Sequence, residues 1–146
     1  MAAVKVTIRS AEVGDYSRCL LLLNSLYHGD IGADFKGMFE SYIRSDDATV
    51  LLAQSPSGVV GILIGSNQMD IDWEGMTARI EAIVVSRRHR RTGIGTNLVN
   101  HFVSIAQRRG CKAVKSRVGM KNGASQRFHE SLGFTKARTF EYMLSL

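Results

Sequence analysis

The segment Met76–Arg109 constrains the fold most, because it combines a strand pattern, a short basic loop with two glycines and a long helical pattern. Met76–Val85 is apolar enough for an interior strand, and Ile94–Arg109 carries apolar residues at helical spacing up to Gly110, which ends the helix. The first N–H groups of a helix have no intrahelical partner and lie at the positive end of its dipole. The segment therefore predicts an anion site, and a pyrophosphate suits it.

The loop itself is Arg90-Arg91-Thr92-Gly93-Ile94-Gly95. Gly93 and Gly95 lack the side chains that would keep a phosphate oxygen from the backbone, and nearby arginines can bind phosphate oxygens. The loop does not contain the Gly-x-x-x-x-Gly-Lys-Ser/Thr pattern of nucleoside triphosphatases. It also departs from the Gly-x-Gly-x-x-Gly pattern of dinucleotide sites, since the position of the third glycine is occupied by Leu98.

The rest of the chain predicts an α/β domain with a mixed sheet covered by helices on both faces. Strands are expected at Val4–Arg9, Thr49–Ala53, Val59–Ile64 and Ala113–Val118, with one or two more in Phe134–Leu146. Helices are expected at Asp15–Tyr27, Asp34–Arg44 and Ala124–Leu132. We expect residues 1–146 to form a single domain.

The charges are divided unevenly along the 146 residues. Up to Glu81 there are 6 Lys and Arg against 11 Asp and Glu, and from Ala82 onward there are 13 against 2. A basic second half suits nucleic acid, a membrane surface or a polyanionic small ligand. Few aromatic residues interleave with the arginines, which counts against single-stranded nucleic acid, and the glycine loop favours the small ligand.

Composition gives a few further expectations. Apolar runs are too short to cross a bilayer, and the first residues do not resemble a signal peptide, so we expect a cytoplasmic protein without a membrane partner. Cys19 and Cys111 are expected to be buried, inert thiols. Their spacing supports neither a disulfide nor a metal site.

Two motifs together resemble the GNAT superfamily of N-acetyltransferases. Arg90-x-x-Gly93-x-Gly95 is similar to that family's Gln/Arg-x-x-Gly-x-Gly/Ala signature, and Asn122 to Phe134 is similar to its Asn…Ala-x-x-x-Phe-Tyr-x-x-x-Gly-Phe segment. The resemblance covers roughly Val50–Leu146. It implies acetyl-CoA as co-substrate and a mostly antiparallel sheet whose splayed strands hold the CoA arm.

The resemblance also implies which residues bind the cofactor. Backbone groups of Ile83 and Val85 would bind the pantetheine arm, and an N–H near Val84 or Val85 would polarise the acetyl carbonyl. The pyrophosphate would lie on the amides from Arg91 to Thr96, with Arg87 and Arg88 near the 3′-phosphate. The implied cofactor-binding residues are Ile83, Val84, Val85, Arg90, Arg91, Thr92, Gly93, Ile94, Gly95, Thr96, Asn122 and Phe128.

The chemistry requires a group that takes a proton from the amine and one that returns a proton to the thiolate. Glu81 is the candidate base, expected on the strand face of Ile83 and Val85; its structural alternatives are a salt bridge to Arg79 or a solvated place at the strand edge. For the acid, His129 stands where the family usually has Tyr, and Tyr142 on the expected last strand is an equal alternative.

The expected acceptor is the primary amine of a small cationic metabolite or antibiotic. Asp70, Asp72 and Glu74 are candidates to line its approach with Glu81, or are solvated loop acids. A protein lysine or N-terminal acetyltransferase, a non-catalytic CoA-binding module and a nucleic-acid-binding module are the alternatives. A homodimer is possible, since dimers are common in such families.

Overall fold

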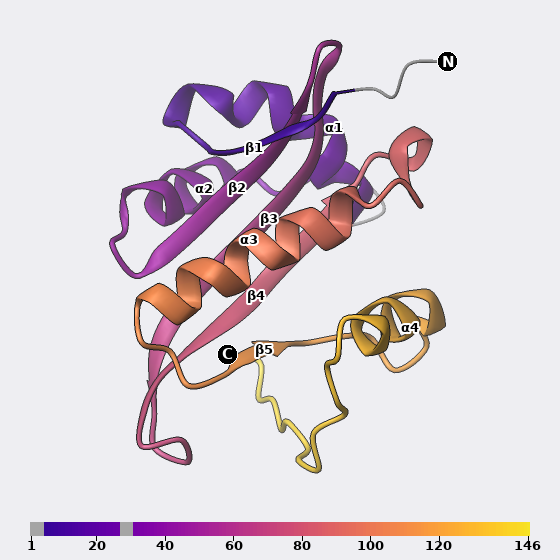
Figure 1. Cartoon of the computed structure of the whole chain (residues 1–146). Coiled ribbons are helices and arrows are strands. Elements are labelled where there is room, and N and C mark those ends of the chain that lie inside the picture. The colour runs from indigo at the N-terminus through magenta and orange to yellow at the C-terminus, as the bar shows by residue number, and fades with distance from the viewer. Residues whose placement is uncertain (1–4, 27–30) are drawn as a thin grey trace.

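The computed structural model describes residues 5–26 and 31–146 as a five-stranded sheet with helices on both faces (Figure 1). The strands are β1 (Thr7–Ser10), β2 (Ala48–Ser55), β3 (Gly58–Asp70), β4 (Gly75–Val85) and β5 (Val114–Ser116). The helices are α1 (Tyr16–Leu26), α2 (Phe35–Arg44), α3 (Ile94–Arg108) and α4 (Gly123–Ser131), with short 3-10 turns η1 (Val13–Asp15) and η2 (Arg87–His89). The predicted order of elements is confirmed up to α4.

The sheet follows the order of the sequence, β1-β2-β3-β4-β5. The first three pairings are antiparallel, and the turn Pro56-Ser57 joins β2 to β3 as the sequence predicts. β4 and β5 are parallel, and α3 forms the connection between them. The predicted mixed, mostly antiparallel sheet is therefore confirmed.

Alternate residues of the strands face two apolar clusters. One cluster lies under α3 and includes Leu63 and Ile80 with Phe102 of the helix. Gly65 lets α3 approach closely, since a Cβ there would overlap the ring of Phe102. The other cluster lies under α1 and α2 and includes Ile62 with Phe39.

One prediction about the fold is wrong. The segment Phe134–Leu146 was expected to form one or two strands, but none of its residues, all of which the structure describes, joins the sheet. The reason is physical: a strand needs a ladder partner, and this segment runs off the body instead. Two residues of the predicted elements, Val4 and Tyr27, lie outside the described residues.

The two cysteines differ. Cys19 is fully buried in α1, as predicted, and burial raises the pKa of its thiol to about 11. Cys111 is only half-buried, with its Sγ 3.8 Å from Oδ1 of Asn67. No helix within the described part of the chain is both long and apolar enough to cross a membrane.

Candidate functional site

A gap opens in the sheet between β4 and β5. The two strands pair only from Ala78↔Val114 to Ile80↔Ser116, and β4 continues to Val85 without β5 beside it. Figure 1 shows the chain after β5 diverging from β4 toward α4. The sheet thus offers an unpaired stretch of β4 edge, which is the splaying that the resemblance implied.

The backbone of Ile83 and Val85 points into this gap. Ser86 N–H donates to the Val60 carbonyl at 2.8 Å, so that pair is hydrogen-bonded across β3 and β4. Because such pairs alternate in antiparallel strands, Val84 also bonds β3, whereas Ile83 and Val85 present their N–H and C=O groups to the other side. From the sequence, the amide that polarises the acetyl carbonyl could belong to Val84 or to Val85. The Val84 N–H faces β3 and not the gap, so only the Val85 N–H is available for this role.

The basic loop bends twice through the left-handed region. Arg91 has φ 61° and Gly93 has φ 85°, which only glycine adopts without strain. Gly93 is the N-cap of α3 and offers no side-chain cap to its first turn. The amides of Ile94, Gly95 and Thr96 therefore point out of the helix without an intrahelical acceptor. Such a turn suits a diphosphate.

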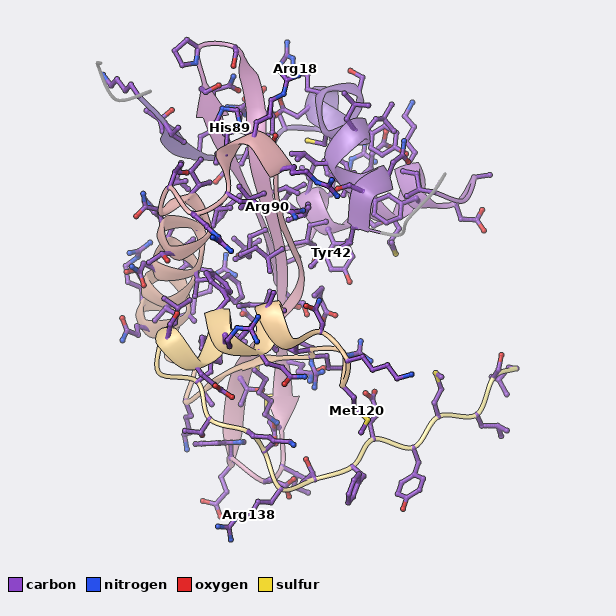
Figure 2. The ribbon with its side chains drawn as sticks, turned by 90° about the vertical axis from the view of Figure 1, so that its right-hand side faces the viewer. Arg18, Tyr42, His89, Arg90, Met120 and Arg138 are labelled. Carbon is purple, nitrogen blue, oxygen red and sulfur yellow. The ribbon has the colours of Figure 1, made fainter. Side chains whose placement is uncertain are left out.

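Two side-chain hydrogen bonds shape the loop, and one of them joins it to the end of β4. Arg90 Nε donates to the Val85 carbonyl at 3.2 Å, and the Thr92 hydroxyl donates to the His89 carbonyl. Figure 2 shows Arg90 and His89 at the same end of the sheet. Arg90 thus shapes the loop through Val85, in addition to any contact with phosphate.

Gly95 allows close packing, in addition to leaving the backbone amides of the loop accessible. A Cβ at this position would lie 3.2 Å from Cζ of Phe128 and 3.7 Å from Cγ2 of Val85. The ring of Phe128 therefore occupies the space that a side chain at position 95 would need. Phe128 therefore packs α4 against the start of α3.

Glu81 lies at an irregularity in β4. The register with β3 shifts between Ile64↔Ala82 and Gly65↔Ile80, which leaves Glu81 as the extra residue of a bulge. Its Oε1 accepts a hydrogen bond from the Ser66 hydroxyl at 2.8 Å, and its Oε2 lies 3.9 Å from Arg117 Nη2.

The bulge corrects the expected orientation of Glu81. The sequence placed it on the strand face of Ile83 and Val85, which pack against the cluster under α3. The extra residue reverses the alternation at this point, so Glu81 bonds Ser66 on the face of α1 and α2 instead. Its ionic neighbour in the described chain is Arg117, in place of the predicted alternative partner Arg79.

His129 is buried between α4 and β5, with 6% of its surface exposed. Its Nδ1 lies 2.8 Å from the Ser125 carbonyl, and its Nε2 lies 2.9 Å from the Ser116 hydroxyl. Since a carbonyl only accepts, Nδ1 donates to Ser125, and Nε2 shares a hydrogen bond with the Ser116 hydroxyl. Both nitrogens are thus engaged: Nε2 connects α4 to β5, and Nδ1 bonds a carbonyl within α4.

Asn122 and Tyr142 take places that sequence reasoning did not foresee. Asn122 is the N-cap of α4, where its Oδ1 accepts from Ser125 N–H at 3.1 Å. Tyr142 was expected on a last strand; it lies in the unpaired segment and is 94% exposed. The structure therefore brings both Glu81, beside Arg117, and His129, bonded to Ser116, to the end of β5, whereas Tyr142 is exposed.

The comparison with known proteins decides the family. Residues 18–134 match the acetyltransferase (GNAT) family.

The chain belongs to the GNAT acetyltransferase family. It is 28% identical over 138 residues to the uncharacterized N-acetyltransferase CgeE of Bacillus subtilis, an alignment covering 92% of this chain and 53% of that protein. The chain spans about half the length of curated relatives that it matches.

Solved structures share the fold at low sequence identity. An aminoglycoside 6′-N-acetyltransferase from Acinetobacter baumannii superposes with a TM-score of 0.86 at 23% identity, covering 97% of this chain and 99% of that one. An aminoglycoside N-acetyltransferase in complex with CoA gives a TM-score of 0.89 at 18% identity, covering 99% and 97%. The predicted GNAT family and its acetyl donor, acetyl-CoA, are confirmed.

The loop acids Asp70, Asp72 and Glu74 lie at the far end of the β3–β4 hairpin from Glu81. The pair Asp70↔Gly75 is five positions along β3 from Gly65↔Ile80, about 17 Å at ~3.4 Å per residue. Asp70 forms an ion pair with Lys115 and accepts from the Thr77 hydroxyl at 3.3 Å. The Lys115 ammonium holds the pKa of Asp70 below its usual range. Asp70 therefore stabilises the β3–β4 hairpin.

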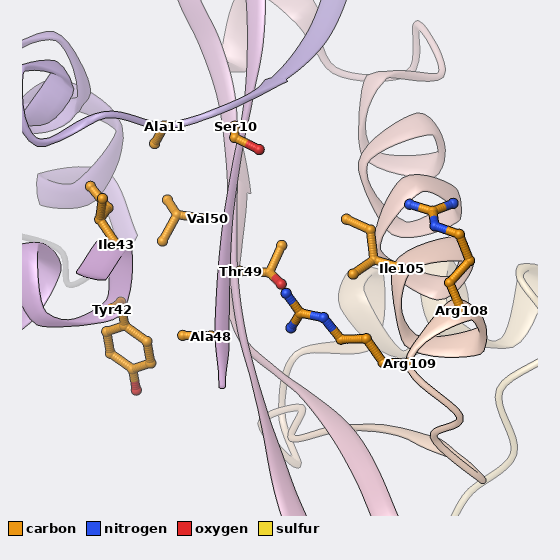
Figure 3. Close-up of a pocket in the computed structure, with 10 residues that line it drawn as sticks. All are labelled: Ser10, Ala11, Tyr42, Ile43, Ala48, Thr49, Val50, Ile105, Arg108 and Arg109. Carbon is orange, nitrogen blue, oxygen red and sulfur yellow. The ribbon is translucent and has the colours of Figure 1, made fainter. Parts of the chain in front are cut away.

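Two hollows flank β2. A pocket of about 370 Å³ lies at the C-terminal end of α3, with Thr49 between Arg109 and Tyr42 (Figure 3). It is remote from the basic loop, since α3 has 15 residues and so spans about 22 Å. A shallow groove of about 250 Å³ lies between α2 and β3 and includes Ser66, the partner of Glu81.

Sequence reasoning missed three polar residues around the gap. Ser66 bonds Glu81, Arg117 lies beside Glu81, and Ser116 bonds His129. Arg117 belongs to the basic second half of the chain, but nothing in its local sequence distinguished it. The roles of Ser66 and Ser116 could not be predicted from the sequence, because each serine bonds a residue on a different element of the fold.

Proposed function

We infer that the protein transfers an acetyl group from acetyl-CoA to a primary amine of a small cationic molecule. The observation that carries the proposal is the unpaired edge of β4. Ile83 and Val85 face the gap, and the turn around Gly93 exposes the first amides of α3 beside it. A pantetheine arm adds to the edge as an extra strand, while the pyrophosphate lies on the turn.

The Val85 N–H is placed to polarise the acetyl carbonyl. It lies on the side of β4 that faces the gap, and the neighbouring Val85 carbonyl is held by Arg90. A donor fixed in advance stabilises the oxyanion that forms when the amine attacks the thioester. Arg90 therefore acts as a positioning residue for this amide.

Glu81 is the base in this proposal. Its side chain is 23% exposed and is oriented by the Ser66 hydroxyl, so its second oxygen can accept a proton from the acceptor or from a bridging water. The carboxylate also attracts an ammonium group before reaction. No internal acid is assigned, because both ring nitrogens of His129 are engaged and Tyr142 is 94% exposed; the thiolate then takes its proton from solvent or from the amine.

The shallow groove beside Ser66 is the candidate acceptor site. Its lining is mostly apolar, through Met38, Tyr42 and Ala48, and it carries short polar groups from α2 and β3 together with Asp47. Hydroxyls, an amide and a carboxylate can bind a substrate with several hydroxyl and amino groups. The aminoglycoside acetyltransferases with the same fold act on molecules of this kind by their names, which supports the same substrate class here.

An acceptor screen by release of free CoA thiol tests the proposal. The 146-residue chain with acetyl-CoA is offered aminoglycosides, polyamines and amino sugars, beside peptides with free N-terminal and lysine amines. Acetylation confined to small amines is the expected result. Turnover of peptides alone would establish the protein acetyltransferase instead, and CoA binding without turnover of either panel would make the domain a binding module.

A further inference from the structure

The pocket at the C-terminal end of α3 exists because β1 ends before β2 does. β1 pairs with β2 as far as Ser10↔Leu51, and the chain then turns into η1. The first two residues of β2, Ala48 and Thr49, thus have no neighbour from β1. Figure 3 shows α2 on one side of this free edge and α3 on the other. The space between them is the cavity of about 370 Å³.

The charge of the pocket is positive only. Arg108 and Arg109 line it from the end of α3, beside the hydroxyls of Ser10 on β1 and Thr49 on β2. None of its ten lining residues, all of which the structure describes, is Asp or Glu. A hollow lined by two cations and no anion attracts a negatively charged ligand.

The two arginine side chains are not engaged by the protein itself. Within residues 5–26 and 31–146, neither guanidinium forms an ion pair or a hydrogen bond. They are not needed as caps, because backbone donors reach the last carbonyls of α3. The Arg109 N–H bonds the Ile105 carbonyl at 3.0 Å, and the Gly110 N–H bonds the Gln107 carbonyl at 3.0 Å.

Thr49 supplies a polar group of a different kind. The residue is 9% exposed, and its hydroxyl has no hydrogen-bond partner in the described part of the chain. Figure 3 shows Arg109 extending from α3 toward Thr49. A hydroxyl at a buried position without a partner costs free energy, which a ligand oxygen would recover. The hydroxyl and the guanidinium thus form a set of donors suited to one carboxylate.

We propose that this pocket binds a small organic acid, with the carboxylate on Arg109 and Thr49. The body of the ligand packs against an apolar wall that includes Ile43, Val50 and Ile105. At about 30 Å³ per water the pocket of about 370 Å³ equals about a dozen waters, so it suits a ligand with about as many non-hydrogen atoms. The site lies at the opposite end of α3 from the basic loop, so this ligand is distinct from CoA.

Amide chemical-shift titrations test the site, with CoA at saturation so that the basic loop is not free to bind the probe. Benzoate, phenylacetate and 4-methylpentanoate are each compared with the uncharged amide of the same skeleton. The acids should bind with a Kd of about 1 mM or below, at least ~10-fold tighter than the amides, and shift the backbone signals of Thr49 and Ile105. Absence of binding, equal affinity for acid and amide, or shifts confined to residues outside the pocket would overturn the proposal.

Three variants separate the two donors from the general charge of the protein. Arg109→Gln should weaken binding of the acids at least ~10-fold and Thr49→Val about 3–10-fold, with the affinity for the amides unchanged. Arg138→Gln is the matched control, because it removes the same charge at an exposed position outside the pocket and should bind as wild type. Equal weakening by Arg109→Gln and Arg138→Gln would refute a specific site.

Two further measurements guard the interpretation. Thermal unfolding and the affinity for CoA should stay at wild-type values in all three variants, since none of the three residues belongs to the core or to the basic loop. The readout is binding and not turnover, so the result does not depend on which amine the enzyme acetylates.

Discussion

A Cβ on Gly95 would lie 3.2 Å from Cζ of Phe128, so the first turn of α3 and the ring on α4 share one small space. Gly95→Ala should lower the free energy of unfolding by about 1–2 kcal/mol, because the added methyl overpacks the contact. Phe128→Leu should relieve part of this cost in a double-mutant cycle measured by urea denaturation.

Gly37→Ala is the matched control for this change. Gly37 lies inside α2, and a Cβ added there would meet nothing within 4 Å. Alanine at this position should stabilise the protein by about 0.5–1 kcal/mol through helix propensity. Equal effects at positions 37 and 95 would contradict the packing role of Gly95.

Gly93→Trp should weaken CoA binding by ~100-fold or more, because an indole on the turn covers amides that otherwise make charge-assisted bonds to the pyrophosphate. Calorimetric titration with CoA measures the change. Gly93→Ala is the control: it carries the same strain from φ 85° but adds only a methyl. Unchanged affinity in the tryptophan variant would place the pyrophosphate elsewhere.

Glu81→Gln should lower kcat by ~100-fold, the usual contribution of a general base. The amide keeps the shape of the side chain and its bond from Ser66, but cannot take a proton. The pH–rate profile should lose its acidic limb. A profile identical to the wild type would remove Glu81 from proton transfer, and a change confined to KM would limit it to binding the acceptor.

His129→Ala should destabilise the protein by roughly 2 kcal/mol, since it removes the hydrogen bond from α4 to Ser116 of β5 and the bond to the Ser125 carbonyl within α4. His101→Ala on the exposed face of α3 is the control and should be near neutral. Thermal unfolding gives the comparison. Loss of the basic limb of the pH–rate profile in the His129 variant alone would instead assign it the role of general acid.

Asp15→Ala should lower the free energy of unfolding by about 3 kcal/mol, because it leaves two arginines without their buried partner. Asp15 is 2% exposed and bonds Arg9 at 2.8 Å through both carboxylate oxygens, with Arg18 at 3.0 Å. The hydrogen bonds from Arg9, followed by those from the Glu12 amide and Arg18, hold the pKa of Asp15 well below its usual range.

The pH dependence of this effect has a definite sign. A carboxyl with a lowered folded-state pKa stabilises the protein above its unfolded pKa of about 3.9, and the contribution is lost as the pH falls further. Urea titrations at pH 7 and pH 3 should therefore show a smaller gap between Asp15→Ala and wild type at pH 3. Asp72→Asn, at an exposed position, should show no such convergence; a constant gap would contradict the ion pair.

Local sequence signals were sufficient to predict the order of strands and helices and the basic turn before α3. These signals are the spacing of apolar residues, Gly93 at a helix start and Gly110 at its end. Two motifs in the right order were enough to indicate the family. Each signal involves residues close together in the chain, so one sequence carries it.

The orientation of the site, by contrast, depends on contacts between elements that are distant in the chain. The bulge that moves Glu81 toward Ser66 depends on the register of β3 against β4, and the engagement of His129 depends on Ser116, 13 residues away. Residues 134–146 were expected to form strands, yet they remain outside the sheet. A strand exists only where another strand bonds it, and that is a property of the assembled structure rather than of the segment.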